Sequence, residues 1–92
     1  MRDKKVIIFG KNDCAKCKTT KNKIDHYISK WGLADHVPVV FFNVDTIDGL
    51  SESAFRDVAK IPTTIVEQRE VTLARWDGEV PHSETLRASL QT

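Results

Sequence analysis

The only two cysteines of this chain, Cys14 and Cys17, restrict its possible folds more than any other feature. They enclose Ala15 and Lys16 in a C-x-x-C tetrad, which lies between a short apolar run, Val6–Phe9, and a long helical pattern. Two intervening residues allow the first turn of a helix to bring the sulfurs within bonding distance. Because a helix N-terminus favours a thiolate, a C-x-x-C pair at a strand-to-helix junction is typical of redox proteins. The tetrad therefore predicts thiol–disulfide chemistry in an α/β fold.

Length and composition indicate one small globular domain over residues 1–92, with 29% charged and 40% hydrophobic residues. No apolar run approaches the ~20 residues that span a bilayer, so we expect no membrane association. The run Val6–Phe9 is too short for the core of a signal peptide, and we therefore expect a cytoplasmic protein. Cysteines in that compartment are more often catalytic or metal-binding than structural.

Charge is distributed unevenly along the chain. Residues 1–31 carry nine Lys/Arg and three Asp/Glu, a net +6, whereas residues 32–92 carry five and ten, a net −5. One interpretation is a solvated basic helix face. The other is a positive field around the cysteines, which would favour a thiolate and attract acidic partners. We expect no nucleic-acid partner, because the basic segment lacks interleaved aromatic residues.

The first half of the sequence predicts a βαβ unit. A strand at Val6–Phe9 precedes a helix that is capped by Asn12 or Asp13 and ends near Gly32. Apolar residues recur at helical spacing along this helix, at Ile24, Tyr27, Ile28 and Trp31. The dense β-branched and aromatic segment Val37–Val44 predicts a buried strand. We expect the two strands to be parallel and the connection right-handed.

The second half predicts a helix, a hairpin and a final helix. After a turn at Asp45–Gly49, Ser51 would cap a helix that continues to about Lys60. Leu50 and Phe55 would form its hydrophobic staple, and its buried positions would be Ala54, Phe55, Val58 and Ala59. The remaining expected elements are the strands Thr63–Glu67 and Val71–Trp76 and a short helix that begins at Ser83. The resulting order is βαβαββα.

Residues in both halves of the chain resemble the thioredoxin/glutaredoxin superfamily. The segment Val6–Cys14 is similar to the first strand and active-site loop of glutaredoxins, including a lysine, Lys11, three residues before the first cysteine. Ile61-Pro62-Thr63 matches the [IV]-P-T signature of the superfamily, in which the proline is cis, and Gly78 lies where thioredoxins keep a glycine. The resemblance implies a thioredoxin fold, with a mixed four-stranded sheet flanked by helices. It also implies electron transfer between disulfides without a dissociable cofactor.

The resemblance assigns roles to the tetrad. Cys14 would be the nucleophile and Cys17 the resolving cysteine, and the positive charges of Lys16 and Lys18 would tune the nucleophilic thiol. The candidate substrate-binding residues are Lys11, Ile61, Pro62, Thr63 and Trp76. Trp76 is open to two interpretations, core packing or partner contact. Thr63 has two interpretations as well, substrate contact or an ordinary role in the strand.

The tetrad departs from both branches of the superfamily. Ala15-Lys16 replaces the Gly-Pro of thioredoxins, and Trp76–Glu79 replaces the Gly-Gly motif that binds glutathione in glutaredoxins. The sequence therefore argues against glutathione as a partner, although Lys11 is retained as a possible contact. The expected partners are a restricted set of disulfide-containing proteins and an upstream thiol reductant. We expect the protein to be a monomer.

Two other functions are compatible with the cysteine pair. Cys14 and Cys17 could be ligands of a metal or a cluster, or the chain could be a binding module without turnover. A metal site within one chain would need further ligands, but His26, His36 and His82 do not have ligand spacing relative to the pair. We interpret these histidines as ordinary surface residues.

Overall fold

The computed structural model describes residues 3–91 and contains the seven elements that the sequence predicts, in the predicted order. They are β1 (Lys4–Gly10), α1 (Ala15–Lys30), β2 (Val39–Asn43), α2 (Ile47–Phe55), β3 (Thr63–Gln68), β4 (Val71–Asp77) and α3 (Ser83–Gln91). None of the helices in this part of the chain combines the length and apolar character needed to cross a membrane.

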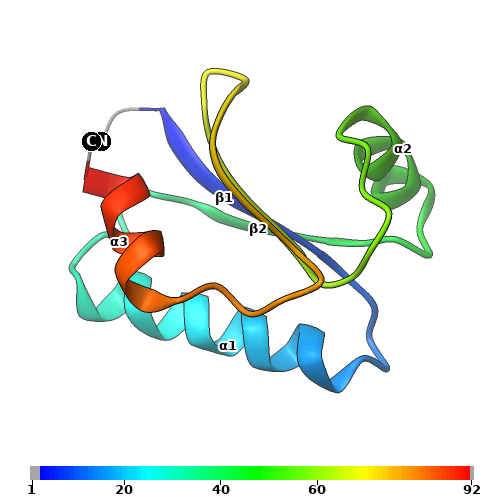
Figure 1. Cartoon of the computed structure of the whole chain (residues 1–92), viewed down its shortest axis with the longest axis horizontal. Coiled ribbons are helices and arrows are strands. Elements are labelled where there is room, and N and C mark those ends of the chain that lie inside the picture. The colour runs from blue at the N-terminus through cyan, green and yellow to red at the C-terminus, as the bar shows by residue number, and fades with distance from the viewer. Residues whose placement is uncertain (1–2, 92) are drawn as a thin grey trace.

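The four strands form one mixed sheet in the order β2-β1-β3-β4. β1 is parallel to β2 and antiparallel to β3, and β3 pairs with β4 as the expected hairpin. The hairpin turns at Arg69 and Glu70, which both have positive φ, 50° and 69°. The helices cover both faces of the sheet, α1 and α3 on one and α2 on the other (Figure 1). This is the mixed four-stranded sheet that the sequence predicts.

The larger core lies between the sheet and the helices α1 and α3. It contains Val6, Ile8, Ile24, Ile28, Leu33, Val37, Val66, Trp76, Leu86 and Leu90. Trp31 packs against it and is only partly buried. A smaller cluster of Ile7, Phe9 and Ile65 lies on the other face of the sheet. Alternate residues of β1 therefore contribute to the two cores, which explains why this strand is apolar throughout.

The start of α1 differs from the sequence prediction. Asn12 and Asp13 are exposed, and the N-cap is Cys14, with extended φ and ψ of −102° and 111°. Its Sγ accepts a hydrogen bond from the backbone N–H of Cys17. The helix ends as predicted, since Gly32 follows its last turn at φ 70°. Cys14 therefore lies at the boundary of α1 and not within its first turn.

The predicted start of the second helix is wrong. Thr46 caps α2 by accepting a hydrogen bond from the N–H of Gly49 (3.0 Å), so the segment interpreted as a turn is the first part of the helix. A Cβ on Gly49 would lie 1.8 Å from the carbonyl oxygen of Asn43, which shows how closely α2 approaches the end of β2. The buried residues of this helix are Gly49 and Ser53. The cap predicted at Ser51 is therefore five residues too late.

The staple and most of the apolar face predicted for this helix are also absent from the described structure, although Val58, beyond the end of α2, packs against the smaller core. Leu50 and Phe55 are 57% and 74% exposed, and Ala54 and Ala59 are exposed as well. Small residues face the sheet because the helix axis lies close to the β2 backbone, so the larger apolar side chains point outward.

The second strand is shorter and less buried than the sequence predicts. It covers Val39–Asn43, and every residue in it is only partly buried. The reason is its place in the sheet, because β2 is an edge strand with β1 as its single neighbour among residues 3–91. The sequence run alone does not distinguish an edge strand from a central one.

Candidate active site

The two cysteines form a disulfide at the point where β1 leads into α1. Their Cα atoms are 5.2 Å apart, within the usual range for a disulfide. The backbone N–H of Cys17 donates to Cys14 Sγ over 3.1 Å. Cys14 is partly exposed, whereas Cys17 is 0% exposed. Of the two bonded residues, Cys14 is therefore the one with surface that a partner can contact.

Gly10 explains how Cys17 is buried. A Cβ at this position would lie 2.9 Å from both Cβ and Sγ of Cys17 and 3.2 Å from Cε2 of Phe41. The last residue of β1 must therefore lack a side chain for the disulfide to pack against the sheet. The sequence analysis treated Gly10 only as the end of a strand. A glycine that ends a buried strand four residues before a reactive cysteine is the signal that could have identified this role.

We expect Gly10→Ala to destabilise the protein by about 1–3 kcal/mol, because the added methyl group overpacks a rigid contact. Denaturant-induced unfolding of the oxidised protein would measure the loss. Gly32→Asn is a suitable control, since Gly32 has open space around it and asparagine tolerates a positive φ. Equal losses in the two variants would contradict the proposed steric role of Gly10.

Ile61 borders a cavity that Lys11, three residues before Cys14, also lines. The Ile61–Pro62 peptide bond is cis, and the Pro62 carbonyl accepts a hydrogen bond from the Gly78 N–H (2.7 Å). A cavity of about 390 Å³ contains Lys11 and Ile61 in its lining, together with Leu50 and Val58. Two of the predicted substrate-binding residues, Lys11 and Ile61, thus share one concave surface. Lys11 also lies 3.6 Å from Asp45 through its ammonium group.

Comparison with protein-family models and with curated proteins finds no match. Solved structures match closely in three dimensions. Thioredoxin-2 of the malaria parasite, a component of its protein secretion machinery, has a TM-score of 0.78 at 22% identity, over 96% of this chain and 81% of that one. Thioredoxin 1 of Thermosipho africanus has a TM-score of 0.69 at 21% identity, over 95% and 90%. Mitochondrial thioredoxin 3 of Saccharomyces cerevisiae has 0.75 at 18% identity, over 100% and 81%.

The chain has the thioredoxin fold. The fold implied by the resemblance, which rested on the tetrad and on Ile61-Pro62-Thr63, is thus confirmed. In this thioredoxin fold, the disulfide lies at the N-terminus of the helix that follows the first strand. The similarity to thioredoxins covers almost the whole chain.

Two of the predicted substrate-binding residues have internal roles in this thioredoxin fold. Thr63 is 0% exposed, and its Oγ1 donates to the carbonyl of Lys60 over 2.6 Å. Trp76 is 8% exposed and belongs to the larger core. These positions favour the strand role for Thr63 and the core role for Trp76, the alternatives that were weighed beside substrate contact. The register of β4 explains why Trp76 is buried, since it pairs with Thr64 of the central strand β3 and faces α1 and α3.

Lys16 connects the tetrad to the backbone that follows β4. Its Nζ donates a hydrogen bond to the carbonyl oxygen of Gly78 over 2.7 Å. Gly78 is itself bonded to Pro62 through its N–H. The residue that replaces the usual proline of the tetrad therefore links the start of α1 to the end of β4, a contact that the sequence did not predict. Lys18 is exposed and follows Cys14 by one helical turn.

The three histidines lie apart from the disulfide in sequence, and all three are exposed. Within residues 3–91, no group of three or more His, Cys, Asp and Glu side chains is arranged to hold a metal ion.

Proposed function

We propose that the protein is a thiol–disulfide oxidoreductase, in which Cys14 and Cys17 alternate between dithiol and disulfide. The observation that carries the proposal is the unequal exposure of the bonded pair at a helix N-terminus. Cys14 is accessible, whereas Cys17 is 0% exposed. This arrangement suits an attacking sulfur and a resolving sulfur, whereas a structural cross-link over so short a loop would stabilise the chain only slightly.

The proposed reaction transfers two electrons from the protein to a substrate disulfide. The thiolate of Cys14 attacks one sulfur of the substrate, the substrate S–S bond breaks, and the first substrate sulfur leaves as a thiolate that takes up a proton. A mixed disulfide now joins Cys14 to the substrate. Cys17 then loses its proton and attacks Cys14 Sγ, which releases the second substrate thiol and forms the Cys14–Cys17 disulfide. An upstream dithiol reductant returns the pair to the reduced state.

The backbone of α1 supports the reactive form of Cys14. Because Cys14 is the N-cap, its sulfur faces the unpaired N–H groups of the first turn and accepts the N–H of Cys17 at 3.1 Å. The same N–H would stabilise a thiolate in the reduced protein. Lys18 lies one turn farther along on the same face and adds positive charge.

The Ile61-Pro62 segment is the proposed binding site for the substrate chain. In residues 3–91, neither the N–H nor the C=O of Ile61 hydrogen-bonds to another backbone group. These groups are suited to pair with an extended substrate segment, as in β-strand addition. The adjacent cavity would then accept a substrate side chain between Ile61 and Leu50.

A redox titration would test the function directly. We expect labelling of free thiols across glutathione buffers, read by mass spectrometry, to show a reversible two-electron Cys14–Cys17 couple between about −280 and −180 mV. The reduced protein should also reduce a peptide disulfide repeatedly with dithiothreitol as the reductant, and Cys14→Ser should abolish turnover. No reversible couple, or thiols protected until a chelator is added, would instead favour the metal-carrier or binding-module alternative.

A further inference from the structure

A second cavity lies beside the disulfide, on the side of α1 that faces the edge strand. Its volume is about 380 Å³, and it is lined by Lys11, Asn12, Lys18, Lys21 and Phe41. Three of these five residues are lysines, and no carboxylate is among them. The proposed function already uses Lys11, which also lines the cavity at Ile61, and Lys18, for its charge near Cys14, but it gives Lys21 and Phe41 no role.

The helix repeat places two of the lysines on the face of α1 that begins at its N-cap, Cys14. Cys14, Lys18 and Lys21 are separated by four and three residues, so they share one face of α1. Phe41, on β2, connects this cavity to the disulfide, because its ring and Cys17 Sγ lie 3.2 Å and 2.9 Å from the point where Gly10 would carry a Cβ. The cavity lining therefore reaches the packing around Cys17, and Lys18 lies one helical turn after Cys14.

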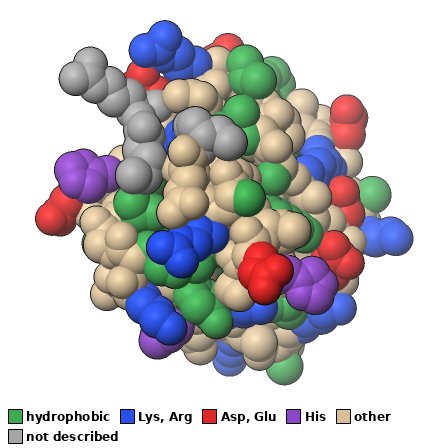
Figure 2. Space-filling model, turned by 60° about the vertical axis from the view of Figure 1, so that its left-hand side comes forward, with side chains coloured by type: hydrophobic (Ala, Val, Ile, Leu, Met, Phe, Trp, Pro, Cys, Tyr) green, Lys and Arg blue, Asp and Glu red, His purple; other side chains and the backbone are tan. Residues whose placement is uncertain are grey.

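The positive charge of the cavity is only partly neutralised. Lys11 Nζ lies 3.6 Å from Asp45, and Lys21 Nζ lies 2.9 Å from Asp25. Lys18 forms no ion pair with another residue in the described part of the chain. The three lysines and these two aspartates leave a net +1 around the cavity, and the exposed Asp13 lies in the adjoining loop. By contrast, acidic and basic side chains are interspersed on the face shown in Figure 2, where the disulfide end of the molecule points away from the viewer.

We propose that this cavity selects protein disulfides that are flanked by acidic residues. The inference rests on the proposed oxidoreductase function and specifies its substrate class. The lysines bind aspartate or glutamate carboxylates next to the substrate disulfide, and the Phe41 ring packs against the methylene groups of these side chains. The positive charge of the cavity would increase the rate at which acidic substrates associate with the protein. It would also stabilise the mixed disulfide that joins such a substrate to Cys14.

Three disulfide peptides that differ only in the residues flanking the disulfide, with glutamate, glutamine or lysine there, would test this proposal. We expect the glutamate peptide to exceed the glutamine peptide by about tenfold in kcat/KM at an ionic strength of about 10 mM, and the lysine peptide to be slowest. The preference should fall toward unity at about 1 M salt. The double variant Lys18→Gln/Lys21→Gln should lose most of the preference.

The matched control is Lys23→Gln/Lys30→Gln, which removes the same charge from the same helix at positions outside the cavity. This control should keep the preference for glutamate. If the wild-type protein reduces all three peptides at equal rates, the oxidoreductase function stands and the inference about acidic substrates is overturned. If Lys18→Gln/Lys21→Gln slows the glutamate and glutamine peptides by the same factor, the lysines act on the Cys14 thiolate, and the inference is again overturned.

A binding experiment separates the inference from turnover. A glutamate peptide with serine in place of both cysteines cannot react, yet it should shift the amide resonances of Lys18, Lys21 and Phe41 in an NMR titration. The equivalent lysine peptide should leave them in place. Shifts with the glutamate peptide in a protein that reduces no disulfide would support the site for acidic peptides and contradict the oxidoreductase function. No shifts would overturn the inference.

Discussion

Replacing Cys17 with serine is expected to arrest the protein as a mixed disulfide with its substrate. Cys14 remains partly exposed in this variant and can still attack, but no buried thiol is present to release the substrate. Turnover should therefore fall to the background rate while about one equivalent of substrate becomes attached to each protein molecule. Intact-protein mass spectrometry under non-reducing conditions would measure the adduct, and dithiothreitol should remove it.

Cys14→Ser is the matched control for this experiment. It keeps one thiol per molecule, but that thiol is the buried Cys17, so we expect no adduct from the folded protein. Adducts that form only with Cys14→Ser would show that the two cysteines have the opposite roles. The small size of serine keeps steric change at either position low, and thermal unfolding of both variants would verify that the fold is retained.

The parts of the structure that the sequence predicts correctly depend on local patterns. The apolar run of β1 and the helical stripe of α1 each show a hydrophobic pattern that is compatible with few other structures. The polar turn between β3 and β4 likewise separates two strand-like segments. The tetrad adds a chemical constraint, because two cysteines at this spacing can bond only if a tight turn holds them. Together these patterns define the order of elements and the bonded cysteine pair.

The errors occur where a tertiary contact overrides a local signal. Thr46 and Ser51 are both acceptable caps, and the choice between them depends on the close approach of Gly49 to the Asn43 carbonyl. The sequence of α2 alone does not predict this close approach. The same approach turns Leu50 and Phe55 toward solvent, against the expectation that large apolar residues face the core.

The start of α1 is a second case of this kind. Asn12 and Asp13 are better caps than cysteine by propensity, but the disulfide and the packing against Gly10 fix Cys14 at the boundary. The link between Lys16 and Gly78 was likewise not predictable, since it joins residues 62 positions apart. Sequence reasoning therefore predicted the paired cysteines but not the contacts that position them.

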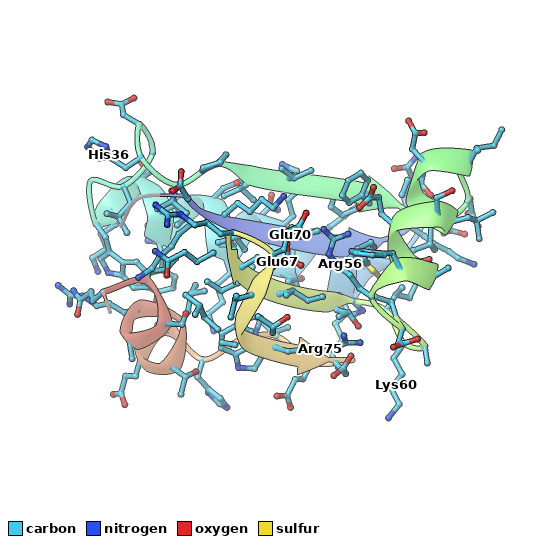
Figure 3. The ribbon with its side chains drawn as sticks, turned by 90° about the horizontal axis from the view of Figure 1, so that it is seen from above. His36, Arg56, Lys60, Glu67, Glu70 and Arg75 are labelled. Carbon is cyan, nitrogen blue, oxygen red and sulfur yellow. A yellow bond between two sulfur atoms is a disulfide. The ribbon has the colours of Figure 1, made fainter. Side chains whose placement is uncertain are left out.

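An ion pair between α2 and the sheet is also absent from the sequence prediction. Arg56, at the C-terminal end of α2, donates from Nε to Glu67 Oε2 over 2.6 Å and from Nη2 to Oε1 over 3.3 Å. The side chains are only 11% and 6% exposed, and Figure 3 shows them facing each other between the helix and the sheet. Arg56 also pairs with Glu52. Through its carbonyl it accepts a hydrogen bond from Arg75 over 2.6 Å.

This pair fixes the chain shortly before the Ile61-Pro62 segment. Arg75 of β4 binds the carbonyls of Arg56 and Asp57, so two arginines hold the end of α2 against the sheet. The hydrogen bond with Glu67 raises the pKa of Arg56, which outweighs the lowering effect of burial. A raised pKa means that this stabilisation is complete at neutral pH and is lost only at strongly alkaline pH.

We therefore expect Arg56→Ala to destabilise the protein by about 3 kcal/mol, because the carboxylate of Glu67 would remain buried with only the more distant Lys5 beside it, at 3.9 Å. Denaturant-induced unfolding would measure the loss, which should be similar at about pH 6 and about pH 9, since arginine keeps its charge across this range. Arg69→Ala is the matched control. Its ion pair with Asp3 is 75% and 53% exposed, so its removal should cost less than about 1 kcal/mol.

The double variant Arg56→Met/Glu67→Leu identifies the origin of the loss. If the buried carboxylate is responsible, replacing both charged residues with apolar ones of similar size should recover most of the stability that Arg56→Ala loses. If the double variant is as unstable as Arg56→Ala, the contribution of Arg56 lies in its other contacts, with Glu52 and with the Phe55 and Phe9 rings. Equal losses for Arg56→Ala and Arg69→Ala would contradict a special role for the buried pair.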